Sequence, residues 1–243
     1  MSINSCHMQV AGMEVLVVRK PIKNLHLSVL PPLGRVRVSA PLAMKDDAIR
    51  TFLATKIAWI NKQKAKFESQ ERQTRREYVS GETHYFLGKR YRLEVIFENK
   101  PPQVHLSGKS KIVLRVRPNS GLAKREEVML RWYRGQLRTM LNELLPKWQK
   151  KIGVQASSWG IKRMKTRWGT CNHKTGRILV NLELAKKPIA FTEYVIIHEL
   201  LHLQEKNHSE RFVDLITKYL PKWRSLKEDL NRFILSHEEW RYH

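Results

Sequence analysis

The stretch from Phe191 to His208 reads FTEYVIIHELLHLQEKNH, and it decides how the rest of the chain is interpreted. His198 and His202 are four residues apart, so on a helix their side chains share one face and can reach one metal ion. Glu199 is rotated by about 100° from His198, which places its carboxylate beside the ion rather than on it. The HExxH spacing therefore predicts a zinc site in which Glu199 takes a proton from a metal-activated water and passes it to the leaving amine.

The residues around this motif support a metal. The predicted helix is otherwise apolar, with Val195, Ile196, Ile197, Leu200, Leu201 and Leu203. Histidines and a glutamate on a buried helix are costly to desolvate without a partner, and a metal ion is a natural partner. The alternative is a pair of core histidines hydrogen-bonded to the backbone, and we favour the metal.

The third ligand must come from residues after the motif. His208 lies six residues after His202 and follows Asn207, a residue type that can leave a helix through the left-handed region. The spacing HExxHxxxxxH is that of the metzincins, whose glycine position is Glu205 here. Glu205 is the rival ligand, because a helix that continued would place its carboxylate near the same face. We favour His208.

The N-terminal part of the chain is predicted to be β-rich. Residues 14–19, 25–30 and 35–40 are short runs of apolar and β-branched residues separated by prolines. The hydrophobic period then changes, and one helix is predicted over residues 44–70. A second β-rich stretch covers residues 83–117.

The C-terminal part is predicted to be mainly helical. A long helical pattern covers residues 124–151, and Pro146 is expected to kink or break it. A hairpin is predicted over residues 159–184, and the remaining helices are predicted over residues 188–204, 209–219 and 222–235. No internal repeat is visible. Strands followed by helices favour an α+β fold, with a β-rich region over residues 1–120 and a zincin-like core over residues 121–243.

The charge of the chain is unusual. Lys and Arg number 46 against 22 Asp and Glu, which gives a formal net charge of +24. The excess is spread along the chain, and such a field attracts polyanions, of which nucleic acid is the commonest in a cytoplasm. Lys162, Arg163 and Lys165 form the densest basic cluster near the zinc motif in sequence. They are candidates for non-specific contacts with DNA phosphates, and the alternative is a solvated face.

The sequence also limits where the protein works. No stretch approaches the roughly 20 apolar residues of a membrane helix, and the first residues lack the features of a signal peptide. Cys6 and Cys171 form neither a metal-binding nor a disulfide pattern. These features predict a cytoplasmic protein without membrane contacts.

The sequence closely resembles the YgjP-like zinc metallopeptidases, which look like relatives of the SprT-like and WLM proteases. The residues that carry the resemblance are YVIIHELLHL at 194–203, NHS at 207–209, Phe212, RWGTC at 167–171, and Ile178 with Asn181. Further matches, such as APL at 40–42 and the segment around Pro221, extend it over nearly the whole chain. Thr170 stands where serine is usual, and this change keeps the hydroxyl group.

The resemblance implies a compact zinc-peptidase core, with the metal helix packed under a small sheet and zinc held by the three histidines. Related SprT-like and WLM proteases act on proteins bound or crosslinked to DNA, which is an analogy here. The segment Arg167, Trp168, Gly169 and Thr170 is either an edge strand that holds a peptide substrate or a packing corner. Asn181 and Glu183 are either partners that orient a histidine or turn formers.

Two hypotheses from different classes follow. The first is a zinc-dependent endopeptidase that acts on peptides or proteins, in the vicinity of nucleic acid. The second is a basic nucleic-acid-binding protein whose zinc site is structural or inactive. Glu199 and an open coordination position favour the first, because structural zinc sites usually have four protein ligands.

Overall fold

The computed structural model describes residues 4–30, 34–68, 76–164 and 167–232. The chain packs as two compact units that divide after Arg75, and each has its own hydrophobic core. This division lies N-terminal to the boundary expected at residue 120. The reason is that the second β-rich stretch packs on the long helix that follows it.

The first unit is a four-stranded sheet followed by helices. Its strands have the order β1-β2-β4-β3, with bounds Asn4–Val10, Met13–Lys20, His26–Leu30 and Arg35–Pro41 for β1 to β4. Strand β1 was not predicted. The single helix expected over residues 44–70 is wrong in one respect, because it is broken at Lys56 into α1 (Asp46–Thr55) and α2 (Ile57–Glu68).

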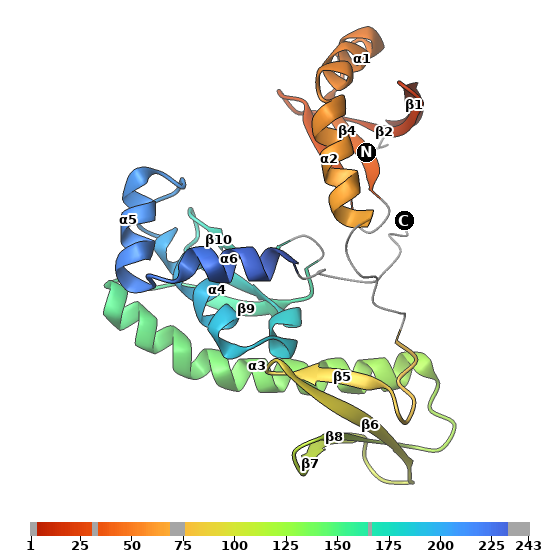
Figure 1. Ribbon diagram of the computed structural model, residues 1–243, viewed down its shortest axis with the longest axis vertical. Coiled ribbons are helices and arrows are strands. Elements are labelled where there is room, and N and C mark those ends of the chain that lie inside the picture. Colours follow the sequence, from red (N-terminus) through yellow and green to blue (C-terminus); the bar gives the residue numbers. More distant parts are fainter. Residues whose placement is uncertain (1–3, 31–33, 69–75, 165–166, 233–243) are drawn as a thin grey trace. The chain divides into compact units, whose positions relative to one another are not determined.

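The second unit begins with another four-stranded sheet and a long helix. The strands have the order β5-β6-β8-β7, with bounds Thr83–Phe86, Lys89–Phe97, Gln103–Ser107 and Lys111–Val116 for β5 to β8. Helix α3 (Leu122–Ile152) continues through Pro146, so the predicted break is wrong; the helix ends at Gly153, whose φ of 79° is left-handed. Helix α3 packs against β7 and β8 of this sheet and against elements that follow it in the chain (Figure 1).

The two four-stranded sheets share one topology, which corrects the absence of a repeat in the sequence analysis. In each sheet the second and fourth strands are parallel, and each of them has an antiparallel neighbour at the edge. Each first hairpin turns through a residue and a glycine that both have positive φ, Ala11-Gly12 and Leu87-Gly88. Positive φ at both central positions is typical of the tight turns that match strand twist. The repeat therefore lies in the backbone path.

The C-terminal half of the second unit combines a small sheet with three helices. Strands β9 (Ser158–Lys162), β10 (Gly169–Asn172) and β11 (Arg177–Asn181) have the order β10-β11-β9, so β10 is an edge strand. The 3₁₀ helix η1 (Leu182–Lys186) follows β11. The remaining helices are α4 (Ile189–Leu201), α5 (Glu210–Tyr219) and α6 (Trp223–Arg232).

Helix α4 lies at the centre of this half. It packs against α3, α5, α6 and β10 (Figure 1). Most of its residues are buried, which explains its nearly uniform apolar sequence. The α+β fold class is therefore confirmed. Within the described part of the chain, no helix combines the length and apolar character needed to cross a membrane.

Candidate metal centre

His198 and His202 stand on the last turn of α4. His198 lies inside the helix, and His202 is its C-terminal capping residue, with its backbone N–H 3.3 Å from the His198 carbonyl oxygen. Helical geometry therefore extends to His202, and both side chains lie on one face of the helix, as the i, i+4 spacing predicts. The helix ends at Leu201, three residues earlier than predicted. The chain then leaves the helix through a tight turn.

This turn differs from the one expected at Asn207. The backbone N–H groups of Leu203 and Gln204 bond to carbonyl oxygens three residues earlier, which tightens the helix end. Asn207 is not among the described residues with positive φ. The left-handed turn predicted there is therefore wrong, and the helix end itself redirects the chain.

His208 is positioned by the start of the next helix. Ser209 is the N-cap of α5, and its hydroxyl oxygen accepts a hydrogen bond from the Phe212 N–H at 3.3 Å. An N-cap fixes the backbone of the residues at the helix entry. His208 directly precedes this cap, so its side chain is directed toward α4.

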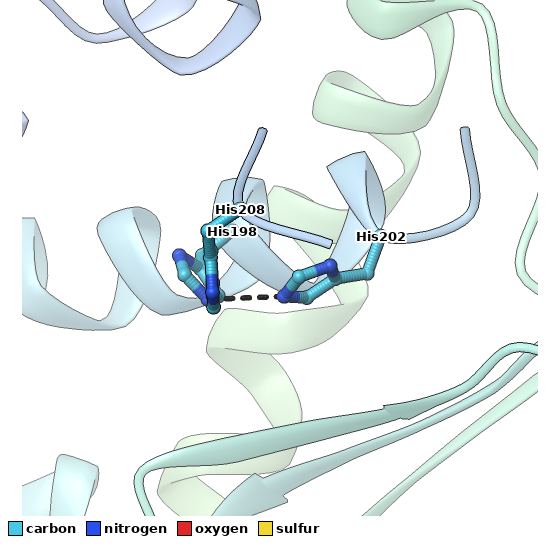
Figure 2. A group of neighbouring side chains, drawn as sticks. All are labelled: His198, His202 and His208. Atoms are coloured by element: carbon cyan, nitrogen blue, oxygen red, sulfur yellow. Dashed lines mark hydrogen bonds between the residues drawn. The ribbon is translucent and has the colours of Figure 1, made fainter. Parts of the chain in front are cut away.

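The three imidazoles meet at their Nε2 atoms. His198 Nε2 lies 3.2 Å from His202 Nε2 and 3.1 Å from His208 Nε2 (Figure 2). Tetrahedral zinc with Zn–N bonds of about 2.0–2.1 Å separates two ligand nitrogens by about 3.3–3.4 Å. The spacing of the nitrogens therefore fits one small ion at their centre.

The backbone of Glu205 orients the second histidine. His202 Nδ1 lies 3.0 Å from the Glu205 carbonyl oxygen, and in this pair the ring N–H donates. Its Nε2 then keeps a free lone pair, which is the tautomer that a metal ligand needs. Glu205, the rival third ligand, thus contacts the site through its carbonyl group. The group of potential ligands found within the described residues contains His198, His202 and His208.

Phe212 supports all three rings. It is buried, and its ring centroid lies 5.1 Å from that of His198 and 4.8 Å from those of His202 and His208. The ring is nearly parallel to His202, with an interplanar angle of 29°. An apolar wall of this kind restricts the imidazole rotamers and lowers the local dielectric constant. The sequence analysis matched Phe212 to the family and assigned it no role.

The surroundings of His198 and His208 lower the pKa of both imidazoles. Burial lowers the pKa of His198 to about 3, and the neighbouring His202 and His208 and the Lys227 cation act in the same direction. The pKa of His208 is also lowered, first by burial. A metal binds the neutral imidazole, so these shifts favour ligation over protonation.

Glu199 lies beside the triad in a buried position. Its side chain is held against β10, where the Cys171 backbone N–H donates to the carboxylate. Burial raises the pKa of the Glu199 carboxyl to about 8, while the Arg167 charge and the Cys171 N–H oppose this shift. A carboxyl group with a pKa near neutrality is suited to accept and return a proton.

The structure places the predicted substrate-binding segment at the same site. Gly169 and Thr170 belong to the edge strand β10, and Arg167 is exposed just before it. Trp168 is half-buried and packs against the core, as the packing alternative expects, while substrate binding by this segment stays a prediction. Within the described residues, the hydrogen bonds of the Asn181 side chain go to backbone groups, among them those that lead into β10, rather than to a histidine.

The predicted basic cluster does not form one exposed group. Lys162 is exposed at the end of β9, whereas Arg163 is half-buried and its Nη1 lies 3.1 Å from Glu126 Oε1. Lys165 lies outside the described residues. An arginine engaged with a carboxylate is less available to a phosphate, so Arg163 is the weakest candidate of the three, and DNA contacts of the cluster stay a prediction.

Comparison with known proteins identifies the family. The model of the YgjP-like metallopeptidase domain matches residues 23–233. The chain belongs to the YgjP-like metallopeptidase family. As a YgjP-like metallopeptidase, the protein acts on peptides or proteins and requires a metal ion. A search of curated proteins found no match.

Two solved structures are similar to this YgjP-like metallopeptidase over part of its length. The zymogen of abylysin from Pyrococcus abyssi is 22% identical, with a TM-score of 0.35, and the match covers 37% of this chain and 90% of abylysin. The zymogen of jannalysin from Methanocaldococcus jannaschii is 19% identical, with a TM-score of 0.35, and the match covers 38% of this chain and 94% of jannalysin. Both of these proteins are metallopeptidases.

Proposed function

We propose that the protein is a zinc-dependent endopeptidase in which His198, His202 and His208 hold the metal and Glu199 is the general base. The observation that carries this proposal is the convergence of three imidazole Nε2 atoms next to a buried carboxylate. Zinc accepts nitrogen ligands in tetrahedral geometry, and three histidines are a frequent catalytic set. The proposal therefore specifies the metal, the ligands and the base.

The donor set favours catalysis over a structural metal. Within the described residues, the cluster of potential ligands consists of three histidines. A structural zinc site usually has four protein ligands, whereas a catalytic site keeps a position for water or substrate. Bound zinc lowers the pKa of a water molecule and polarises a carbonyl group. The partially exposed His208 leaves the triad open to solvent on one side.

Glu199 is placed to move protons during hydrolysis. Glu199 directly follows His198 in the chain, and its carboxylate accepts a hydrogen bond from the Cys171 N–H. As a general base it takes a proton from water, and as a general acid it returns that proton to the amine of the cleaved bond. Burial keeps bulk water from competing for the carboxylate.

Strand β10 offers a surface for an extended substrate. It pairs with β11 on one side, and as an edge strand it has unpaired backbone groups on the other. Its first residue, Gly169, touches Glu199. A substrate added to this edge by backbone hydrogen bonds would pass the metal and the base. This mode binds the middle of a polypeptide and favours an endopeptidase.

The competing function is a basic nucleic-acid-binding protein with an inactive zinc site. Its support is the net charge of +24, which attracts nucleic acid without specifying a binding surface. A buried carboxyl with a raised pKa beside the triad has no role in such a protein. We therefore keep DNA binding as a property of the peptidase that a titration can test.

Metal analysis combined with proteolysis tests the proposed function. The purified protein should contain about one zinc per chain, hydrolyse fluorescein-labelled casein, and lose this activity after removal of the metal by a chelator and regain it with added zinc. Internal cleavage sites identified by mass spectrometry would establish endopeptidase action. A protein that holds zinc and cleaves neither casein nor a broad peptide library would contradict the proposal and favour the structural site.

A further inference from the structure

Asn181 is the most completely bonded buried polar side chain near the site. It ends β11 and is fully buried, with 0% of its surface exposed. Its Nδ2 group donates to the carbonyl oxygens of Met164 at 2.8 Å and Arg167 at 2.7 Å. Its Oδ1 accepts from the N–H groups of Glu183 at 3.2 Å and Met164 at 3.3 Å. Both donors and both acceptor positions of the amide are therefore used.

These bonds hold the backbone that enters β10. Met164 and Arg167 lie on the two sides of the residues that the structure does not describe, and both are bonded to the same side chain. The Asn181 backbone N–H adds a bond to the Trp168 carbonyl oxygen at 2.9 Å. The backbones of Met164, Arg167 and Trp168 are thus bonded to the residue that ends the neighbouring strand.

Strand β10 in turn holds the general base. Gly169 packs directly against the Glu199 side chain, and the Cys171 N–H donates to the Glu199 carboxylate. A displacement of β10 would therefore move the surroundings of Glu199 and the free edge of the strand together. Displacements of about 1 Å at catalytic groups cost up to about a hundredfold in rate.

We propose that Asn181 is a positioning residue for hydrolysis, which fixes the entry of β10 and thereby sets the place of Glu199 and of the substrate-binding edge. This inference rests on the proposed function, because β10 matters to hydrolysis only if Glu199 is the base. The metal ligands come from α4 and the segment before α5, so metal binding does not depend on Asn181.

A structural role at the start of η1 is the competing explanation. Asn181 is the N-cap of η1 through its bond to the Glu183 N–H. Asn181→Asp separates the two roles, since aspartate is an equally good cap and keeps the acceptor oxygen. The same substitution removes the two donors to the Met164 and Arg167 carbonyl oxygens, but it also adds a buried charge. Asn181→Ser, an uncharged cap that lacks the amide donors, is therefore measured beside it. A residue that only caps η1 tolerates Asn181→Ser, whereas a residue that holds β10 does not.

A matched control lies on the other edge of the same sheet. Gln149 is also an amide side chain that holds backbone ahead of a strand, because its Oε1 accepts from the Ala156 N–H at 2.8 Å just before β9. Strand β9 is at the far edge of the sheet from β10. Gln149→Ala therefore reports the general cost of losing such a bond in this sheet.

The experiment measures zinc content, casein hydrolysis and hydrogen exchange in wild type, Asn181→Asp, Asn181→Ser and Gln149→Ala. We expect all three variants to bind one zinc. Casein hydrolysis per zinc-loaded molecule should fall at least about tenfold in both Asn181 variants, as for groups that orient a catalytic residue, and stay within about twofold of wild type in Gln149→Ala. Exchange in peptides covering residues 164–172 should rise in both Asn181 variants, while exchange in α4 stays unchanged.

Several outcomes would overturn the proposal. One is an Asn181→Asp or Asn181→Ser variant with wild-type hydrolysis and wild-type exchange over residues 164–172. Another is an Asn181→Asp variant whose activity falls only in proportion to its loss of zinc or of folded protein. If Asn181→Asp does not fold, the result for Asn181→Ser decides. If wild type cleaves no casein, the proposed function fails, and the exchange of residues 164–172 alone decides whether Asn181 positions β10.

Discussion

Gly169 lies so close to Glu199 that no other residue fits at this position. A Cβ atom built on Gly169 would be 2.6 Å from Glu199 Oε1 and 2.8 Å from Val195 Cγ1. Contacts below about 3 Å are repulsive, and the Val195 side chain is buried and has no room to withdraw. The absence of a side chain at Gly169 is what allows the edge strand to approach the helix that carries the histidines.

Gly169→Ala should therefore impair hydrolysis and leave the metal in place. The new methyl group pushes β10 and the Glu199 carboxylate apart, and we expect casein hydrolysis to fall by about a hundredfold. Zinc content measured by atomic absorption should equal that of wild type. Gly160→Ala on β9 is the control, since its Cβ would meet the end of the Leu179 side chain at 3.3 Å. Equal activities of the two variants would contradict this account.

The three histidines illustrate how much of the proposed site can be predicted from the sequence. His198, His202 and His208 were selected from their spacing, because a helix brings residues four apart onto one face. The contact between Glu205 and His202 was not predicted, since it uses a backbone carbonyl group that every residue possesses. The turn after Leu201 was misplaced for the same reason: backbone hydrogen bonds form it, and no special residue marks it.

The fold shows the same limit at larger scale. Hydrophobic periodicity predicts most of the strands and helices. It does not predict strand β1 (Asn4–Val10), because this strand lies at a sheet edge and has several polar residues. The repeated sheet topology was also invisible, since pairing between β2 and β4 or β6 and β8 leaves little trace in residue types. Long-range pairing is decided by tertiary packing rather than by local preference.

The identity of the third ligand can be tested by substitution. His208→Ala should lose tight zinc binding, because two imidazoles hold zinc far less firmly than three. Glu205→Ala should keep about one zinc per chain, since the backbone carbonyl that orients His202 survives the change. Zinc titration with a competing chelator measures both. Retention of zinc by His208→Ala together with its loss in Glu205→Ala would exclude our assignment.

Glu199→Gln tests the base. The amide has nearly the same shape and keeps the contact with Gly169, but it cannot accept a proton from water. Zinc content and the thermal midpoint should match wild type, while hydrolysis falls by about 10²–10⁴-fold. Residual activity above about a tenth of wild type would rule out Glu199 as the general base.

His84 predicts how stability depends on pH. Burial lowers its pKa from the usual 6.5 to about 4, whereas Glu82 acts in the opposite direction. Between these values the unfolded chain binds a proton that the folded protein does not, so the free energy of unfolding falls as pH falls. For metal-free protein, urea unfolding at pH 7 and pH 5 should show this loss in wild type. In His84→Gln the loss should be smaller by roughly 2 kcal/mol. Equal losses would show that His84 titrates normally.

The net charge of +24 makes a prediction about DNA. If the basic excess serves nucleic acid, the protein binds duplex DNA without sequence preference, and log affinity falls with log salt at a slope of about −0.9 per neutralised phosphate. Lys162→Glu with Lys165→Glu should weaken binding and leave zinc content unchanged. Arg163 is kept, because its contact with Glu126 contributes to the structure. Fluorescence anisotropy with a labelled duplex at low and physiological salt measures the slope. Absence of binding at micromolar protein in low salt would remove DNA from the function, and the peptidase proposal would stand, because it depends on the histidines and Glu199 alone.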